Sequence, residues 1–252
     1  MRVSGLSVAF CLLLCTRGFC ADLSASFPEL TKLELKDEGV RVWYPKDRAQ
    51  PIAKVPAYLK EVEDAGVYIA EPLLLDLGHG VPKAALACDS GPSNDPSCRL
   101  LTKPDDPDAP GSVIFESPGT DFVFTTSGEI YASGATDYTY DHRRLFRFDG
   151  KHFAEVAQAF RYVGIEGTTT APLALTAERA AGKGKPDAKH TLATLPAKTP
   201  ITILLNATTG DDEYGQNADY LVRTREGLVG WAHIPTKEDG ATIVDGLRYN
   251  GD

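Results

Sequence analysis

The most polar cluster in the strand-rich middle of the chain is Asp141-His142-Arg143-Arg144, which follows shortly after Tyr138 and Tyr140. An arginine can bind a carboxylate through two parallel hydrogen bonds, and tyrosine rings add apolar contact area. This combination predicts a patch that binds an anionic or peptide ligand through Tyr138, Tyr140, Arg143 and Arg144. The same charges are also typical of a hairpin edge that is protected from pairing with further strands. The sequence leaves both interpretations open.

The stretch Asp76-Leu-Gly-His-Gly-Val-Pro-Lys83 has some features of a calcium-binding loop. Calcium takes six to eight oxygen ligands, but here only Asp76 supplies one, and His79 offers nitrogen. A tight turn between two strands is the better interpretation. The five histidines of the chain also lack zinc-binding spacing. We therefore expect no metal and no cofactor.

Nucleophilic catalysis has no recognisable motif in this chain. The sequence contains neither a Gly-x-Ser-x-Gly elbow nor a phosphate-binding glycine loop followed by Lys-Ser or Lys-Thr. A pair of carboxylates for glycoside cleavage stays an alternative, because their separation in space is not visible in a sequence. We predict that the protein is not an enzyme, and that no residue is catalytic.

The first 20 residues have the pattern of an export signal. Arg2 precedes an apolar run from residue 8 to residue 14, and Gly18-Phe-Cys20 forms a cleavage site before Ala21. The run is shorter than the roughly 20 residues that cross a bilayer, so we expect no membrane span. The sequence predicts a bacterial protein that is periplasmic or secreted, with lipidation of Cys20 as an alternative.

The charge of the chain excludes one class of partner. Removal of residues 1–20 takes away Arg2 and Arg17 and no acid, which changes the formal charge from −9 to −11. Nucleic-acid binding depends on the neutralisation of phosphates by Lys and Arg, so nucleic acid is not an expected partner.

Cys88 and Cys98 are the two cysteines that remain after cleavage, and a turn-rich segment separates them. In an oxidising compartment such a pair predicts a structural disulfide.

Alternating apolar residues predict an antiparallel β-rich domain over residues 21–166, arranged as a sandwich or a meander. Val40–Tyr44 and Leu33–Lys36 form an expected hairpin, residues 56–65 an expected short helix, and Asp149-Gly150 is a strong hairpin turn. From about Glu166 the composition changes, and we expect a second domain over residues 167–252. The fold class is therefore mainly β.

Several segments of the second domain occur in the order of a known family: Ala171-Pro-Leu-Ala-Leu175, Thr191 to Leu204, Tyr220-Leu-Val-Arg-Thr224 and Gly227-Leu-Val-Gly-Trp-Ala232. Residues 168–234 thereby resemble a bacterial SH3 (SH3b) domain. The resemblance implies an SH3-like β-barrel that binds a peptide in an aromatic-lined groove. On this basis Tyr214, Tyr220, Arg223 and Trp231 are candidate ligand contacts, although Trp231 also suits a core position.

These features together predict a non-enzymatic binding or adaptor protein of the bacterial envelope. Its expected ligand is a protein or a peptide, including the stem peptide of peptidoglycan. Two alternatives remain open. One is an inhibitor or immunity protein that uses its acidic surface against a basic toxin or cell-wall hydrolase, and the other is a cell-wall hydrolase with unrecognised carboxylates.

Overall fold

The computed structural model describes residues 27–35, 39–52, 58–59, 73–89, 95–103, 111–134, 137–179, 190–207 and 217–251. The predicted signal peptide over residues 1–20, Cys20 and the candidate Tyr214 lie outside these residues. So does most of the helix expected over residues 56–65, of which only Tyr58 and Leu59 are described. The described elements are β-strands joined by turns and a 3-10 turn at Lys46–Arg48, which confirms the prediction of a mainly β protein.

The first sheet has the strand order β1-β2-β8-β9-β10-β11. Its strands are β1 (Leu30–Leu35), β2 (Val40–Pro45), β8 (Asp121–Phe124), β9 (Glu129–Gly134), β10 (His142–Phe148) and β11 (Phe153–Glu155). Neighbours are antiparallel except β2 and β8, which pair in parallel with Val42 opposite Phe122. The predicted hairpins are confirmed, since β1 pairs with β2 and β10 pairs with β11 across Asp149-Gly150.

The second sheet is antiparallel throughout, with the order β3-β4-β5-β6-β7. It consists of β3 (Ala49–Pro51), β4 (Leu73–Leu75), β5 (Ala84–Asp89), β6 (Ser97–Thr102) and β7 (Ser112–Pro118). Residues 76–83 form the expected tight turn between β4 and β5. His79 and its two flanking glycines have positive φ, and the amide of Gly78 donates to Asp76 Oδ1 at 3.1 Å.

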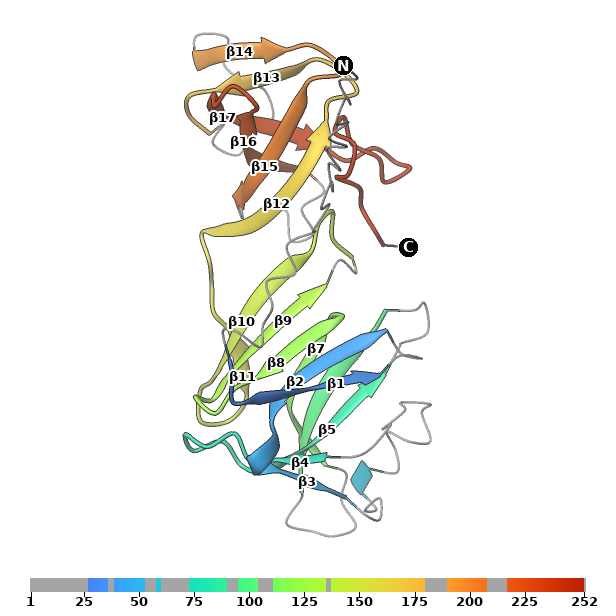
Figure 1. Ribbon diagram of the computed structural model, residues 1–252, viewed down its shortest axis with the longest axis vertical. Helices are drawn as coiled ribbons and strands as arrows, with labels where there is room; N and C mark the ends of the chain where they lie inside the picture. Colours follow the sequence, from blue (N-terminus) through green and yellow to red (C-terminus); the bar gives the residue numbers. More distant parts are fainter. Residues whose placement is uncertain are drawn as a thin grey trace, which may run out of the picture.

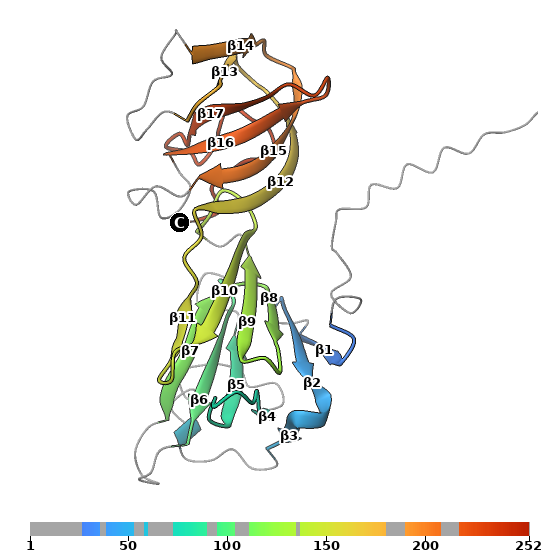
Figure 2. The ribbon, with the colours of Figure 1, turned by 90° about the vertical axis from the view of Figure 1, so that its left-hand side faces the viewer.

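The first two sheets pack face to face around one apolar core, as a sandwich (Figures 1 and 2). Phe115 of β7 lies at its centre. The Phe115 ring is 5.2–6.3 Å from four other phenylalanine rings, contributed by β8, β10 and β11. Cys88 and Cys98 lie opposite each other on β5 and β6 in the same core, and they form the predicted disulfide.

The third sheet has the order β12-β15-β16-β17-β13-β14 and is antiparallel. Its strands are β12 (Phe160–Thr168), β13 (Leu173–Thr176), β14 (Thr191–Leu195), β15 (Pro200–Ala207), β16 (Asn217–Thr224) and β17 (Val229–Pro235). The predicted closing hairpin corresponds to β16 and β17, with Gly227 at positive φ in the turn. The expected barrel is not formed, because β12 and β14 are the two edges of an open sheet.

The third sheet lies above the sandwich in Figure 1, and residues 156–159 connect the two. Phe160–Thr168 therefore belongs to the third sheet and runs through the boundary expected after residue 166. The C-terminal segment packs on this sheet, since Val244 and Leu247 lie in its core and the Asp245 amide donates to the Thr168 carbonyl at 2.9 Å. Tyr140, from the loop before β10, completes the same core.

Candidate ligand-binding surface

The face of the third sheet that points away from its core carries a cross-strand row of large side chains. Tyr162, Leu205, Leu221 and Trp231 are successive partners across β12, β15, β16 and β17. Side chains alternate between the two faces of a strand, and neighbours such as Val163, Val222 and Ala232 on the other face are buried. Tyr162 is 52% exposed, and the other three are partly exposed. Of the two positions expected for Trp231, the structure shows the partly exposed one, outside the core.

Phe160 extends this row by a further aromatic ring. It lies two residues before Tyr162 on the same side of β12, is 48% exposed, and has its ring centroid 6.0 Å from that of Trp231. Three aromatic rings from two strands thus share one outer face. Exposed rings of this kind contribute large contact areas to protein interfaces.

Beside this row, Asp219 and His233 form a polar pair between β16 and β17. The distance from His233 Nδ1 to Asp219 Oδ1 is 3.0 Å, and Arg179 Nε lies 4.0 Å from Asp219 Oδ2. Within the described part of the chain the His233 ring has no other hydrogen-bond partner, so no hydroxyl or thiol is held against it. The pair orients the His233 ring at the edge of the aromatic row.

Arg223, one of the predicted contacts, borders a cavity of about 500 Å³ at the end of β16. Arg225, Thr202 and Glu166 also line this cavity. Arg223 is exposed, and its Nη2 lies 3.4 Å from Thr202 Oγ1. Two arginines beside one glutamate make this cavity a site that favours a carboxylate over a cation.

A second cavity, of about 520 Å³, lies on the outer face of the first sheet. Its walls are largely apolar and come from Phe27, Val123, Tyr131 and Leu145, with Gln158 and the two predicted arginines, Arg143 and Arg144, at the same site. The rings of Phe27 and Tyr131 are 5.7 Å apart. The cavity can therefore hold an apolar side chain against an aromatic wall.

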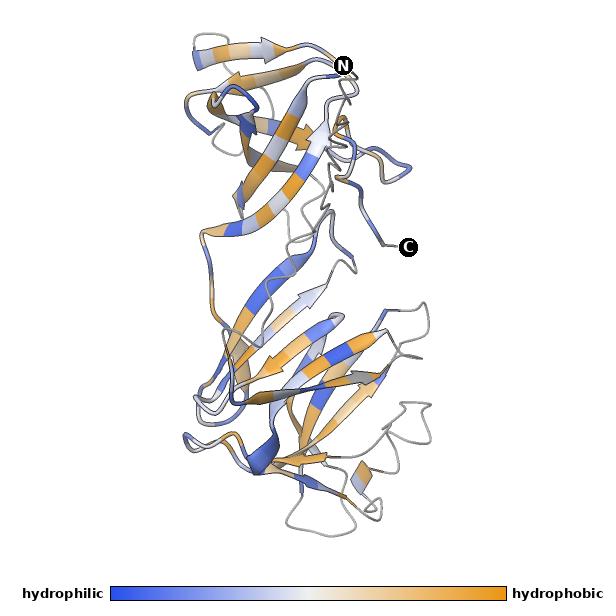
Figure 3. Cartoon of the chain, in the orientation of Figure 1, coloured by the Kyte–Doolittle hydropathy of each residue, from blue (hydrophilic) through white to orange (hydrophobic). Residues whose placement is uncertain are grey.

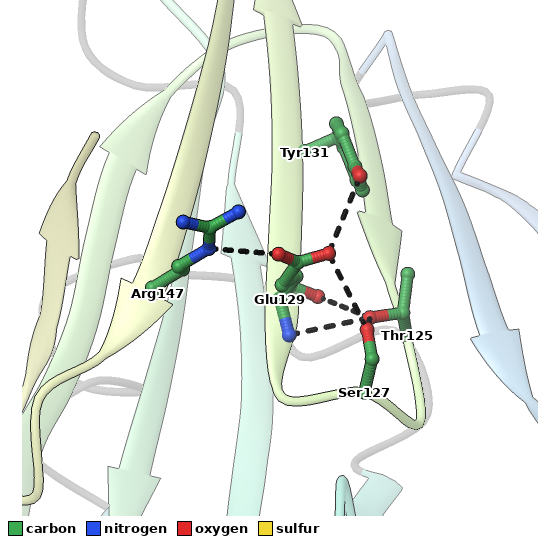
Figure 4. Close-up of polar contacts among 5 residues, drawn as sticks. All are labelled: Thr125, Ser127, Glu129, Tyr131 and Arg147. Atoms are coloured by element: carbon green, nitrogen blue, oxygen red, sulfur yellow. Dashed lines mark hydrogen bonds and ion pairs between the residues drawn. The ribbon is translucent and has the colours of Figure 1, made fainter. Parts of the chain in front are cut away.

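Tyr131 is held in place by a polar network at the turn between β8 and β9 (Figure 4). Its hydroxyl donates to Glu129 Oε2 at 3.4 Å, and Arg147 Nε donates to Glu129 Oε1 at 2.8 Å. Thr125 fixes the Glu129 backbone, since its Oγ1 bonds both the amide and the carbonyl of Glu129. Burial and then the Glu129 carboxylate raise the pKa of Tyr131, while Arg147 lowers it. The tyrosine stays neutral and its ring direction is fixed.

Arg143 joins the two outer faces. Its guanidinium carbon lies 5.0 Å from the centroid of the Tyr162 ring, in a cation–π arrangement, and its Nε donates to Asp141 at 3.3 Å. Because Arg143 also borders the cavity of the first sheet, the surface continues from that cavity to the aromatic row of the third sheet. We call this continuous region the aromatic surface; it comprises Tyr131, Arg143, Phe160, Tyr162 and Trp231.

The structure places the remaining predicted contacts elsewhere. Tyr220 is fully buried and its hydroxyl lies 2.9 Å from Thr139 Oγ1, while Tyr140 is 2% exposed and donates to Asn206 Oδ1 at 3.1 Å. Arg144 is 8% exposed and donates to the Pro118 carbonyl. The Tyr138 ring lies 3.9 Å from that of His142. The three tyrosines belong to the contact between the sheets and not to the aromatic surface. Arg144 lies at the same contact and also lines the first-sheet cavity.

Three rings of the aromatic surface were absent from the prediction: Tyr131, Phe160 and Tyr162. The pair Phe160 and Tyr162 has a weak sequence signal, namely two aromatic residues at i and i+2 just after a turn. Among the described residues, no group of three or more His, Cys, Asp and Glu side chains could hold a metal ion. In the same residues no helix is long and apolar enough to cross a membrane.

In structural terms the chain is a β-sandwich joined to an open six-stranded sheet, with exposed aromatic and arginine side chains on its outer faces. Comparisons with known protein families, with curated proteins and with solved structures find no match to this chain.

Proposed function

We propose that this chain is an exported, non-enzymatic binding protein whose aromatic surface recognises an extended protein or peptide ligand. The observation that carries the proposal is the contact between Arg143 and Tyr162. This contact connects the first-sheet cavity and the exposed rings of the third sheet into a single surface. Aromatic and arginine side chains dominate the binding energy of protein interfaces.

The chemistry of the surface favours a peptide with both apolar and acidic groups. The first-sheet cavity accepts an apolar side chain, and Arg143 and Arg223 are exposed and able to pair with carboxylates. Cell-wall stem peptides are short, extended and acidic, so they belong to this class. The resemblance of residues 168–234 to SH3b domains supports a peptide ligand as well.

The proposed export is supported by the disulfide. Bonds such as Cys88–Cys98 persist in oxidising compartments, and the charge and apolar pattern of residues 1–20 is that of a secretory signal. The ligand would accordingly be met in the periplasm or outside the cell.

The first test is selection from a display library of short random peptides on the immobilised, oxidised chain. The counter-target is a variant with Arg143→Gln and Trp231→Ala. We expect peptides that combine an aromatic residue with Asp or Glu, and at least tenfold weaker binding of them to the double variant. Arg99→Gln, on the second sheet and paired with Glu116, is the matched control and should bind normally. Enrichment of the same peptides on both targets would refute the proposal.

The second test asks whether the ligand is in the cell wall. The chain is co-sedimented with purified peptidoglycan and with the same material after an amidase has removed the stem peptides. Retention that requires the stem peptides assigns them as ligand. Equal retention on both preparations excludes the stem peptides as the ligand. If the chain stays in the supernatant with both, the peptides selected in the first test represent a segment of a protein partner.

A further inference from the structure

The contact between the first and third sheets contains a buried cluster of nitrogen-bearing side chains, which we call the junction cluster: His142 and Arg144 of β10, Arg161 of β12 and Asn206 of β15. His142 and Arg144 are two residues apart and therefore on one side of β10, and Arg161 is the cross-strand partner of Asn206. In Figure 3, β10 changes from orange to blue where it approaches the third sheet.

Several contacts show that the four side chains surround one region. Tyr140 links two of them, because its hydroxyl donates to Asn206 and its ring lies 6.1 Å from that of His142. Burial, and after it the charges of Arg161 and Arg144, lower the pKa of His142 to about 3. Arg144 is two residues from His142 on the same side of β10, and the charges of both arginines act on His142.

The cluster has more hydrogen-bond donors than acceptors. Arg144 Nε, Arg161 Nε, Asn206 Nδ2 and both ring nitrogens of His142 are buried and have no partner among the described residues. His142, Asn206 and Arg144 are 0%, 2% and 8% exposed. Buried donors in native proteins almost always have an acceptor from the protein, from water or from a bound ion. We therefore expect an acceptor within this cluster.

The cluster also has a surplus of positive charge. Arg161 Nη2 lies 3.4 Å from Glu155 Oε1, whereas Arg144 donates to the neutral carbonyl of Pro118. Two guanidiniums thus share one carboxylate, and Glu155 is itself one-third exposed. An uncompensated buried charge is strongly unfavourable, and an anion next to the two arginines would remove the imbalance.

We propose that the junction cluster binds a small oxyanion, of carboxylate or phosphate chemistry, between Arg144 and Arg161. Its oxygens accept hydrogen bonds from the Nε atoms of the two arginines and from Asn206 Nδ2. Since Arg144 belongs to the first sheet and Arg161 and Asn206 to the third, the anion joins the two parts of the molecule. This site does not depend on the proposed function, although Arg144 also lines the first-sheet cavity.

The test uses two probes, inorganic phosphate and acetate, added in the low millimolar range at constant ionic strength to the purified oxidised chain. Calorimetric titration should give saturable binding of one anion per chain. Thermal unfolding should shift upward by about 3–6 °C at ten times the dissociation constant. The probe that binds more tightly distinguishes phosphate from carboxylate as the natural source.

Arg144→Gln and Arg161→Gln should each weaken binding at least tenfold, while Arg147→Gln, on the outer face of the same β10 strand, should bind like the unmodified chain. If either glutamine variant fails to fold, the titration of the unmodified chain still decides. Absence of saturable binding of both anions would show that water satisfies the donors, and an unchanged affinity in folded Arg161→Gln would place the anion elsewhere. Either result overturns the proposal.

Discussion

In the sandwich core, the Phe115 ring meets four phenylalanine rings, and the Cys88–Cys98 disulfide lies in the same core. At the junction, by contrast, buried nitrogen atoms of His142, Arg144 and Arg161 have no partner among the described residues. The first region is stabilised by buried apolar area, and the second depends on charge and protonation. The two halves of the protein should therefore respond to different conditions: the sandwich to packing changes, the junction to pH and anions.

The largest expected effect comes from the sandwich. Phe115→Ala should lower the free energy of unfolding by about 3–5 kcal/mol, because it removes the ring that fills the centre of the core. The loss, measured by urea unfolding, should be the same at pH 7 and pH 5. Val113→Ala on the same strand is the control, since Val113 is 48% exposed and should cost less than about 0.5 kcal/mol. A small or pH-dependent loss for Phe115→Ala would contradict the comparison.

The disulfide gives the second effect. Replacement of both Cys88 and Cys98 by Ala should cost roughly 2–3 kcal/mol, mainly because the unfolded chain regains the entropy of its open loop. Reduction of the unmodified chain should give a similar loss in the same unfolding measurement. If the oxidised and reduced chains unfold at the same urea concentration, the bond does not stabilise the sandwich.

Local features of the fold could be predicted from the sequence, and long-range ones could not. Asp149-Gly150 and Gly227 allow the backbone of tight turns, and the hairpins around them were confirmed. The parallel pair of β2 and β8 has no local signal, because the second sheet lies between these strands in the sequence. The open edge at β14 likewise depends on strand pairings that no local pattern contains.

The site was predicted in part, for a similar reason. Arg143, Arg223 and Trp231 lie on outer faces as a binding role requires, but Tyr140 and Tyr220 are buried, because their hydroxyls find partners inside. Alternation along Phe160-Arg161-Tyr162 would place the two rings in the core and the arginine in water. The structure has the opposite arrangement, since the Arg161 side chain, 18% exposed, points to the junction. Burial of a charged group depends on partners distant in sequence, and alternation cannot show them.

The third prediction separates the two regions by pH. His142 faces Arg144 on its own strand, Arg161 on β12, and the rings of Tyr138 and Tyr140. Its pKa is about 3 in the fold and about 6.5 in an unfolded chain. As the pH falls below 6.5 the unfolded chain gains this proton and the folded chain does not. The stability that neutral His142 contributes is therefore full above pH 6.5 and is lost progressively toward pH 3.

Linkage gives this loss a size of about 2 kcal/mol between pH 7 and pH 5. His142→Phe, which keeps a ring next to Tyr138, should flatten the pH dependence of the unfolding free energy by this amount. His152→Phe is the control, because His152 lies on the surface beside Asp149. The idea fails if both variants retain the slope of the unmodified chain.

The smallest expected effect on the free energy of unfolding comes from the loss of one hydrogen bond, either at a buried position or at an exposed one. Tyr220→Phe removes the hydroxyl that lies 2.9 Å from Thr139 inside the junction, and it should cost about 1 kcal/mol or more, because the Thr139 hydroxyl loses this partner away from water. Tyr131→Phe removes the 3.4 Å bond to Glu129 on the surface, where water replaces the hydroxyl, so it should cost less than about 0.5 kcal/mol. Double-mutant cycles with Thr139→Val and Glu129→Gln measure the two coupling energies. Equal couplings would mean that burial at the junction does not strengthen its polar contacts, and the two regions would then differ in composition but not in what stabilises them.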